Sequence, residues 1–380
     1  MTHILHTESS MNMGGQELRI LMEMEGLVQY GFTSVLAARP GSRIVQEART
    51  RGLQVYTLSM RGSLDPVAVA RILQIIWKEK VDLVCTHGSR DGWSAGMAAR
   101  ILRKKTVRSR NVANPIRSHF LGRLVYTALC DLIVTTSEFI GKGMIERGIP
   151  PERIVCVPTG VDHRRFHPDV EKGLFRKDLG ISGEKPLVGM ISVLRGDKGP
   201  DVFLQAAELV LKVHPDAFFT LVGDGWMRGK LETALRRSPY RDNIRLTGFR
   251  KDIPFVMADL DVLVLSAKIP EGVPQTVLQA YAMKLPVIAS DVGGINEVAI
   301  HGKTALLVPP NDPQALADCI LTSLNDPRGM MDRAERSHRM VLEAYTLDMF
   351  LEKMTAIYGD LAVERARRRA SAKTRTGAGQ

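Results

Sequence analysis

The chain has 380 residues, of which 44% are hydrophobic and 24% charged, and its formal net charge is +11. This composition is typical of a soluble globular protein, and the length exceeds what one hydrophobic core usually supports, so we expect two domains. No apolar run reaches the roughly 18 residues that a membrane-spanning helix needs, and the N-terminal residues lack the pattern of a signal peptide.

The four cysteines are scattered among apolar neighbours and form no Cys-x-x-Cys or Cys/His pairing. This usage argues against a zinc site and predicts reduced, buried thiols in a cytoplasmic protein. We expect neither a metal nor a cofactor.

Short strands alternate with amphipathic helices along most of the chain, which predicts right-handed βαβ units and an α/β fold. We expect a first Rossmann-like domain at residues 1–165, a connection at 166–185 and a second Rossmann-like domain at 186–345. Asp312 and Pro313 predict a helix start. A last helix at 346–365 is expected to pack back toward the first domain, before a basic, disordered tail at 366–380.

Positive charge is concentrated in two stretches of the sequence. Between Trp93 and Cys130 there is no acidic residue but a run of cations, and the last residues, RARRRASAKTRTGAGQ, are also basic. Such stretches are typical of sites for nucleic acid, anionic lipid or phosphorylated substrates. The alternative is a solvated basic face with a disordered tail. The cations of the first stretch are Arg100, Arg103, Lys104, Lys105, Arg108, Arg110, Arg117 and Arg123.

Ligands of open α/β sheets bind beyond the carboxyl ends of the strands, so the loops that follow strands are the candidate sites. After the first strand, Gly14 and Gly15 permit close approach of a ligand to the backbone, although a flexible loop explains them equally well. After the strand PLVGMIS, Arg195 and Lys198 precede a helix start, an arrangement that fits a pyrophosphate. A later strand exit carries Arg250.

Two further loops bear on which ligand binds, a dinucleotide or a sugar. The stretch GDGWMRG has Arg228 where a dinucleotide-binding fingerprint has its third glycine, and no acid ends a strand about 20 residues on, which excludes a nicotinamide site. The stretch EGVPQTVLQ places Glu271 at a strand exit, with Pro274 predicted at the first helical position. A carboxylate there can accept hydrogen bonds from two vicinal sugar hydroxyls. The alternative, a charge that complements the helix dipole, leaves the following Gly-Val-Pro unexplained.

Together, the segments RGDKGPDVFLQAAELV, LVGDGWMRGKLE, EGVPQTVLQAYAMKLPVIASDVGGINEV and TALLVPPNDPQALA resemble the C-terminal domain of the family 4 glycosyltransferases. The segments MGGQELRI and PTGVDHRRFHP resemble the N-terminal glycine loop and the hinge entry of the same family. The resemblance covers nearly the whole chain, more loosely between Gly31 and Leu132. It implies a GT-B fold, in which two doubly wound domains face a central cleft.

The resemblance also implies roles for individual residues. Arg195 and Lys198 match the pair that holds the donor diphosphate, and Glu271 matches the first acid of an E-x7-E motif that contacts sugar hydroxyls. Backbone N–H groups of the following turn are implied to approach the phosphate. The implied donor-binding residues are Gly14, Gly15, Arg250, Gly272, Val273, Pro274, Gln275, Thr276 and Gln279.

Two positions depart from the family pattern. Gln279 stands where the family has the second acid, which contacts the ribose, and Asn111 stands where many members have a histidine near the reacting sugar. His87 is the other histidine that the resemblance places in the cleft, although a structural role in its loop is equally consistent. Asn111 and Glu17 are assigned to the acceptor side.

The family implies a retaining, metal-independent transfer of a sugar from a nucleotide sugar to a glycan or lipid-linked acceptor. We expect a role in surface polysaccharide or lipopolysaccharide assembly, with the basic stretches at an anionic membrane surface. Alternatives are a nucleotide-sugar epimerase or sugar-phosphate synthase of the same fold, an inactive transferase, or a nucleic-acid-binding module. No nucleic-acid motif or aromatic interleaving accompanies the basic stretches, so we expect no nucleic-acid partner.

Overall fold

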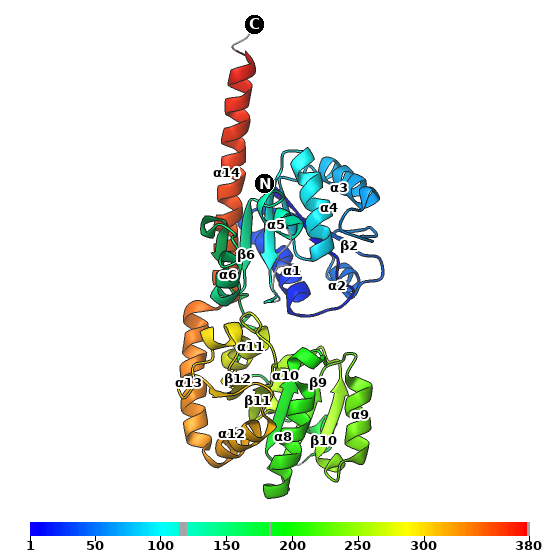
Figure 1. Ribbon diagram of the computed structural model, residues 1–380. Coiled ribbons are helices and arrows are strands. Elements are labelled where there is room, and N and C mark those ends of the chain that lie inside the picture. Colours follow the sequence, from blue (N-terminus) through cyan, green and yellow to red (C-terminus); the bar gives the residue numbers. More distant parts are fainter. Residues whose placement is uncertain (114–119, 182–183, 378–380) are drawn as a thin grey trace. The chain divides into compact units, whose positions relative to one another are not determined.

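The computed structural model describes residues 1–113, 120–181 and 184–377, with only the backbone of residues 120, 121 and 365–377. The chain divides into two compact units (Figure 1), one formed by Met1–Pro158 with Phe350–Gln380 and the other by Thr159–Met349. The expected connection at 166–185 therefore falls inside the second unit. None of the described helices is both long and apolar enough to cross a membrane.

The first unit is built on a parallel sheet of seven strands in the order β3-β2-β1-β4-β5-β6-β7. Its strands are β1 (Thr2–Glu8), β2 (Phe32–Ala38), β3 (Val55–Thr57), β4 (Leu83–Thr86), β5 (Lys105–Arg110), β6 (Leu132–Thr135) and β7 (Ile154–Cys156). Its helices are α1 (Gly15–Gly26), α2 (Arg43–Thr50), α3 (Pro66–Lys78), α4 (Ser89–Ile101), α5 (Phe120–Thr127), α6 (Glu138–Ile145) and most of α14 (Leu347–Gly377). Short 3-10 turns are η1 (Leu27–Tyr30) and η2 (Pro151–Arg153).

The second unit repeats the plan with six parallel strands in the order β10-β9-β8-β11-β12-β13. The strands are β8 (Leu187–Ile191), β9 (Phe218–Val222), β10 (Ile244–Gly248), β11 (Val262–Leu265), β12 (Val287–Ser290) and β13 (Leu306–Val308). The helices are α7 (Leu174–Leu179), α8 (Pro200–Val213), α9 (Arg228–Arg237), α10 (Ile253–Asp259), α11 (Gln275–Ala282), α12 (Pro313–Asn325) and α13 (Pro327–Ala344), with turns η3 (Gly196–Lys198), η4 (Arg241–Asn243) and η5 (Gly293–Glu297). Two parallel sheets with interleaved helices confirm the predicted α/β class.

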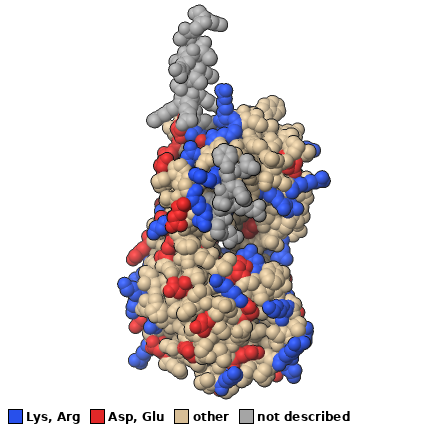
Figure 2. Space-filling model, viewed as in Figure 1, with Lys and Arg blue, Asp and Glu red and all other residues tan. Residues whose placement is uncertain are grey.

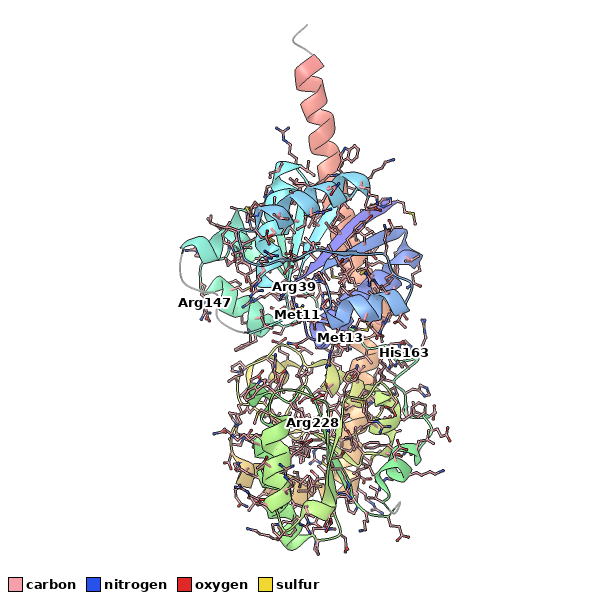
Figure 3. The ribbon with its side chains drawn as sticks, turned by 90° about the vertical axis from the view of Figure 1, so that its right-hand side faces the viewer. Met11, Met13, Arg39, Arg147, His163 and Arg228 are labelled. Atoms are coloured by element: carbon pink, nitrogen blue, oxygen red, sulfur yellow. The ribbon has the colours of Figure 1, made fainter. Side chains whose placement is uncertain are left out.

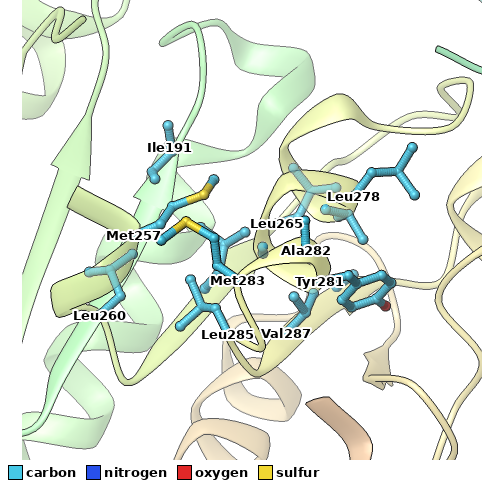
Figure 4. Close-up of a cluster of buried hydrophobic side chains, with 14 of the residues drawn as sticks. Ile191, Met257, Leu260, Leu265, Leu278, Tyr281, Ala282, Met283, Leu285 and Val287 are labelled. Atoms are coloured by element: carbon cyan, nitrogen blue, oxygen red, sulfur yellow. The ribbon is translucent and has the colours of Figure 1, made fainter. Parts of the chain in front are cut away.

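Both faces of the second sheet are covered by buried apolar side chains, which explains why its strands read as continuous hydrophobic runs. Figure 4 shows the cluster on one face, where Tyr281 and Leu278 of α11 pack with Leu265 and Val287 of the sheet. At the start of α12 the Asp312 side chain accepts a hydrogen bond from the backbone N–H of Ala315, as the sequence predicts.

The last helix is longer than predicted. Helix α13 begins at Pro327, and α14 continues to Gly377, so the backbone is helical through most of the segment expected to be a disordered tail. From Phe350 onward α14 belongs to the first unit. Its Tyr358 is fully buried and donates a hydrogen bond to Glu23 of α1, a contact within the first unit between residues far apart in the sequence.

A buried carboxylate organises the start of the second unit. Asp259 is 4% exposed and accepts hydrogen bonds from the backbone N–H groups of Gly173, Phe175 and Arg176, at 2.5, 2.8 and 2.9 Å. It thereby satisfies the free donors at the beginning of α7, which would otherwise be buried without partners.

We predict that Asp259→Ala lowers the free energy of unfolding by about 3 kcal/mol, because several buried donors lose a charged acceptor. Urea unfolding followed by circular dichroism measures the change. Asp216→Ala, which removes an exposed carboxylate from the same unit, is the matched control and should be nearly neutral. Equal stability of the two variants would contradict the prediction.

Candidate functional site

The order of the strands in the second sheet locates its site. The chain passes from β8 outward through β9 and β10, and then returns to the other side of β8 with β11. Ligands of doubly wound folds bind at such a switch point, outside the carboxyl ends of the strands. The loops after β8 and β11 carry Lys198 and Glu271, so the fold brings these two predicted residues together.

Lys198 and Glu271 form an ion pair between the two loops, with the Lys198 Nζ donating to the Glu271 Oε2. Their side chains are 21% and 19% exposed. The second carboxylate oxygen of Glu271, Oε1, is buried and accepts no hydrogen bond from any residue that the structure describes. A buried acceptor without a partner is costly, so Oε1 is suited to a hydroxyl or N–H donor from a ligand.

The backbone around Glu271 is held by the loop after β12. The N–H of Gly294 donates to the carbonyl of Glu271 at 2.8 Å. Gly293 has φ +58°, and a Cβ at this position would lie 2.8 Å from the same carbonyl oxygen, so only glycine fits there. Pro274 is the N-cap residue and α11 begins at Gln275, one residue later than the sequence predicts.

The loop after β8 is fixed in the same way from two sides. Gly199 has φ +66° and lies against the carbonyl of Ser266, the residue after β11, where a Cβ would be 2.0 Å from that oxygen. The Lys268 N–H donates to the Asp197 carbonyl at 2.8 Å. The stretch GDGWMRG, which begins at Gly223, packs on this loop too. A Cβ on Gly223 would lie 1.9 Å from the Ser192 carbonyl oxygen. The GDGWMRG stretch thus supports the loop.

The first turn of α11 offers further polar groups. The Gln275 Nε2 donates to the Gly160 carbonyl at 2.9 Å, while its Oε1 is buried without a partner. Gln279 lies one turn further along the same face of the helix and, like Thr276, makes no side-chain hydrogen bond within the described part of the chain. Gly272 and Val273 are buried beneath Glu271.

The two predicted arginines of this unit are engaged within the protein. Arg195 pairs with Asp197 at 2.8 Å and is 47% exposed, so it lies at the mouth of the loop rather than against Glu271. Arg250 pairs with Asp252 and Asp178, and the hydrogen bonds that its guanidinium donates to these carboxylates raise its pKa above the ordinary value. The Arg250 side chain therefore holds its own loop to α7.

In the first unit the strand order reverses between β1 and β4, and a pocket of about 450 Å³ lies at that switch point. Figure 3 shows Met11 and Arg39, both of which line it. The walls carry mainly hydroxyl, amide and charged side chains. The lining residues are Glu8, Ser9, Ser10, Met11, Asn12, Gln16, Arg39, Gly88, Ser89 and Arg90.

Glu8 and Asp91 form a buried pair of carboxyl groups beside this pocket, and both are fully buried. Burial, together with the charges of Asp91 and Glu17, raises the pKa of Glu8 to about 8. Asp91 accepts hydrogen bonds from Ser9, Thr7 and the backbone of His87 and Gly88. The sequence prediction omitted both residues, although Glu8 carries the same signal as Glu271, an acid at the end of a buried strand.

Three predicted residues of the first unit have mainly internal contacts. Glu17 is 6% exposed and accepts a hydrogen bond from the Gly14 N–H at 2.8 Å, as a cap for α1, which begins at Gly15. The Asn111 Oδ1 accepts a hydrogen bond from Ser109, and its Nδ2 is buried without a partner. His87 is 5% exposed and does not line the pocket.

His87 packs against two other polar residues on one face of the sheet. His6 of β1 and Cys85 of β4 are register partners, and His87 lies two residues beyond Cys85, so all three side chains point the same way. The Nδ1 of His6 and the Nε2 of His87 are 3.1 Å apart, and burial lowers the pKa of both imidazoles. The cluster contains possible metal ligands that the sequence prediction missed in the Cys-x-His spacing.

The basic stretch between Arg100 and Arg123 is largely used inside the protein. Lys105 pairs with Glu364 of α14, and Arg108 is 3% exposed beneath the Tyr126 ring. Arg103 is exposed and its side chain makes no hydrogen bond or ion pair with another described residue, and Arg117 lies outside the described residues. Hydrogen bonds or ion pairs also occupy Arg100, Lys104, Arg110 and Arg123. Arg100, Arg103 and Arg123 are exposed and the other described cations of the stretch are partly or fully buried, so only three of them can contribute to the solvated basic face considered as the alternative.

Two family models match the chain. Residues 13–165 match the family model described as Glycosyltransferase Family 4, and residues 185–326 match the model Glycosyl transferases group 1. The UDP-Gal:alpha-D-GlcNAc-diphosphoundecaprenol alpha-1,3-galactosyltransferase of Escherichia coli is 25% identical over 95% of this chain and 98% of its own. A mannosyltransferase of Corynebacterium glutamicum that is dependent on GDP-mannose is 28% identical over 72% of this chain and 69% of its own.

Solved structures show the same fold. A glycosyltransferase from Rickettsia africae superposes with a TM-score of 0.84 at 22% identity and covers 95% of this chain and 98% of its own. Anabaena HepE in complex with UDP-glucose also has a TM-score of 0.84, at 20% identity, over 95% of this chain and all of its own. The fold is that of the GT-B glycosyltransferases, as predicted.

We predict that stability falls as the pH rises from about 5 to about 8, by up to about 1.4 kcal/mol per pH unit from Glu8. Across this range the unfolded chain releases the Glu8 proton, whereas the folded chain retains it because the pKa of Glu8 is raised to about 8. Glu8→Gln should flatten the dependence and raise stability at pH 8, as measured by urea unfolding at several pH values. Glu146→Gln, which alters an exposed glutamate, should leave the slope unchanged.

Proposed function

The chain belongs to the family 4 and group 1 glycosyltransferases, and from this membership we propose that it transfers a sugar from a nucleoside-diphosphate sugar to a glycan or lipid-linked acceptor. The assignment of the donor site depends on one observation. Lys198 and Glu271 form an ion pair at the switch point of the second unit, and the Glu271 Oε1 has no hydrogen-bond partner among the described residues. One carboxylate oxygen is held by a cation, and the other is left for a donor such as a sugar hydroxyl.

We propose that the donor diphosphate lies beside Lys198 and the start of α8. Lys198 supplies a positive charge, and the first N–H groups of α8 lack partners within their own helix, so both stabilise the charge that develops as the nucleoside diphosphate departs. Arg195, at the mouth of the same loop, adds a second cation after it exchanges Asp197 for phosphate. These groups perform the charge stabilisation that a metal ion performs in other transferases.

In the proposed complex, Glu271 orients the sugar, and Gln275, Thr276 and Gln279 contact the nucleotide. The anomeric configuration of the sugar is retained if the departing donor phosphate accepts the proton of the acceptor on the face of the sugar that the phosphate leaves. The protein then positions the reactants and stabilises charge, and it supplies no general base. The Gln279 amide contributes hydrogen bonds to a ribose without a charge.

The acceptor side is proposed for the pocket of the first unit. Its hydroxyl, amide and carboxyl groups suit the hydroxyls of a sugar, and Arg39 and Arg90 suit a phosphate. The relatives from Escherichia coli and Corynebacterium glutamicum act, by their names, on acceptors that carry a diphospholipid or a phosphatidylinositol. We therefore propose a lipid-linked acceptor in surface polysaccharide or lipopolysaccharide assembly, at the cytoplasmic face of a membrane.

We predict that Glu271→Gln lowers transferase activity at least about a hundredfold while the fold is retained with some loss of stability, because a neutral amide binds the sugar hydroxyls more weakly and leaves Lys198 without its counter-charge. A thermal-shift screen with UDP-, GDP-, ADP- and dTDP-sugars first identifies the donor, and release of its nucleotide in the presence of acceptor then measures activity. Glu335→Gln, which breaks an exposed ion pair with Lys284, is the control. Full activity of Glu271→Gln would contradict the assignment of Glu271 to the donor site.

A second prediction concerns Gln279. The substitution Gln279→Glu should raise the affinity for the donor about tenfold, because a carboxylate accepts from ribose hydroxyls more strongly than an amide does. Isothermal titration with the donor found in the screen measures the dissociation constant. Gln314→Glu, a polar residue on the exposed side of α12, controls for the added charge. A weaker affinity of Gln279→Glu would show that Gln279 selects against the family's usual contact.

A further inference from the structure

The excess positive charge of the chain lies entirely in the first unit. Lys and Arg outnumber Asp and Glu by 28 to 16 in Met1–Pro158 with Phe350–Gln380, but are balanced, 24 to 25, in Thr159–Met349. Figure 2 shows basic and acidic side chains mixed over the visible face of the second unit. An anionic surface therefore attracts the first unit.

Helix α3 of this unit presents an unusual outer face. Its apolar positions Ala68, Ile72, Ile75 and Ile76 are buried against the sheet and α4, which accounts for its place in the fold. The opposite face nevertheless carries apolar side chains as well. Val67 is 65% exposed and Trp77 80%, and Leu64, just before the helix, is 72% exposed.

The exposed positions of α3 recur at helical spacing and so form one surface. They are Pro66, Val67, Ala70, Arg71, Gln74, Trp77 and Lys78, here called the outer face of α3. Two of them are cations, and the sequence of α3 contains no acidic residue. A face with a tryptophan, aliphatic side chains and cations is typical of a helix that lies in a membrane interface.

The two carboxylates next to this face, Asp65 and Glu79, accept hydrogen bonds from within the protein. Asp65, the N-cap residue, accepts hydrogen bonds from the backbone N–H groups of Arg61, Val67 and Ala68. Glu79, the C-cap residue, accepts one from the Tyr56 hydroxyl. The Lys78 ammonium lies 5.3 Å above the Tyr56 ring, and its pKa is raised by the Tyr56 hydroxyl and, to a lesser extent, by the Glu79 carboxylate. Four cations, Arg61, Arg71, Lys78 and Lys80, lie on or beside the outer face with two carboxylates, Asp65 and Glu79, so cations outnumber carboxylates there.

We propose that the outer face of α3 docks the protein on an anionic lipid bilayer, with Trp77, Val67 and Leu64 in the interface and Arg71, Lys78 and Lys80 against lipid phosphates. This surface replaces the stretch from Arg100 to Arg123, whose cations are mostly paired within the protein. The inference rests on the proposed function in one respect. Docking on a membrane brings the protein to the bilayer in which the proposed lipid-linked acceptor is anchored.

The position of α3 in the unit agrees with this role. The helix follows β3, so its first turn and the preceding loop with Leu64 lie at the carboxyl edge of the parallel sheet, where the pocket lined by Glu8 and Arg39 opens. A bilayer against the outer face of α3 thus lies beside the edge that receives the acceptor. The exposed Trp226 of the second unit lies instead against Gly196 in the loop of Lys198.

Sedimentation of the full chain with vesicles of phosphatidylglycerol and phosphatidylcholine at low salt tests the proposal. The wild-type chain should bind these vesicles but not vesicles of phosphatidylcholine alone. Because each cation near an anionic surface contributes about a fivefold factor in partitioning, Arg71→Glu should lower it by at least about tenfold, and Trp77→Ala by at least about fivefold. Arg237→Glu and Val213→Ala, equally exposed positions of the second unit, should bind as wild type does.

A spectroscopic readout places the contact on the helix. In a Trp226→Ala background, Trp77 is the remaining strongly exposed tryptophan, so the fluorescence of this variant should shift to shorter wavelength when anionic vesicles are added. Absence of wild-type binding, equal binding of Arg71→Glu and Arg237→Glu, or an unshifted spectrum would each overturn the proposal. A dimer in solution that Trp77→Ala dissociates would do so too, since the face would then bind a second copy.

Different results contradict the transferase proposal and the membrane-docking proposal. Trp77→Ala should keep the donor-dependent thermal shift and the release of nucleotide with a water-soluble acceptor, because α3 contains none of the donor-site residues. Loss of vesicle binding with retained donor binding supports the docking surface. A chain that binds vesicles but no nucleotide sugar leaves the docking surface intact and contradicts the proposed transferase.

Discussion

The ion pair between Lys198 and Glu271 is the interaction on which the proposed donor site depends. It joins the loops after β8 and β11, the two strands between which the second sheet changes direction. Both charges are mostly removed from water, an arrangement that is tolerated only because each neutralises the other. The tight turns at Gly199 and Gly293 bring backbone against backbone and hold the pair in place. The Glu271 Oε1, which has no hydrogen-bond partner among the described residues, is what suits the arrangement to a ligand that donates a hydrogen bond.

The same topology produces a different electrostatic result in the first unit. There, too, an acid follows a strand next to the switch point, but Glu8 faces Asp91 and Glu17 instead of a lysine. Burial beside like charges favours the protonated form, and the pKa rises accordingly. A carboxylate at the end of a buried strand therefore has no fixed role. Its partner decides whether it serves as an anion that receives hydroxyls or as a carboxyl group that keeps its proton.

This contrast shows how far the sequence alone could lead. Alternating strands and helices predict the α/β class, and the rule that ligands bind at strand exits selects Lys198 and Glu271, which the structure brings together. Strand order is set by tertiary packing, so the sequence does not show that these two exits are adjacent. Arg250 follows a strand, as predicted, but Asp178, 72 residues earlier, accepts a hydrogen bond from its side chain. Glu8 could have been found, because it satisfies the rule that selected Glu271.

Charge is the property for which the sequence was least informative, and the reason is geometric. The run from Arg100 to Arg123 has no acidic residue, yet its cations reach carbonyls, Asp131 and Glu364 that lie far away in the sequence. Conversely, α3 has only two cations, but both lie on an exposed face together with Trp77. Long basic side chains that thread into the fold contribute packing and hydrogen bonds to it. Arg100, Arg103 and Arg123 also remain exposed, so what distinguishes the proposed surface on α3 is that its exposed cations share one helix face with an exposed tryptophan.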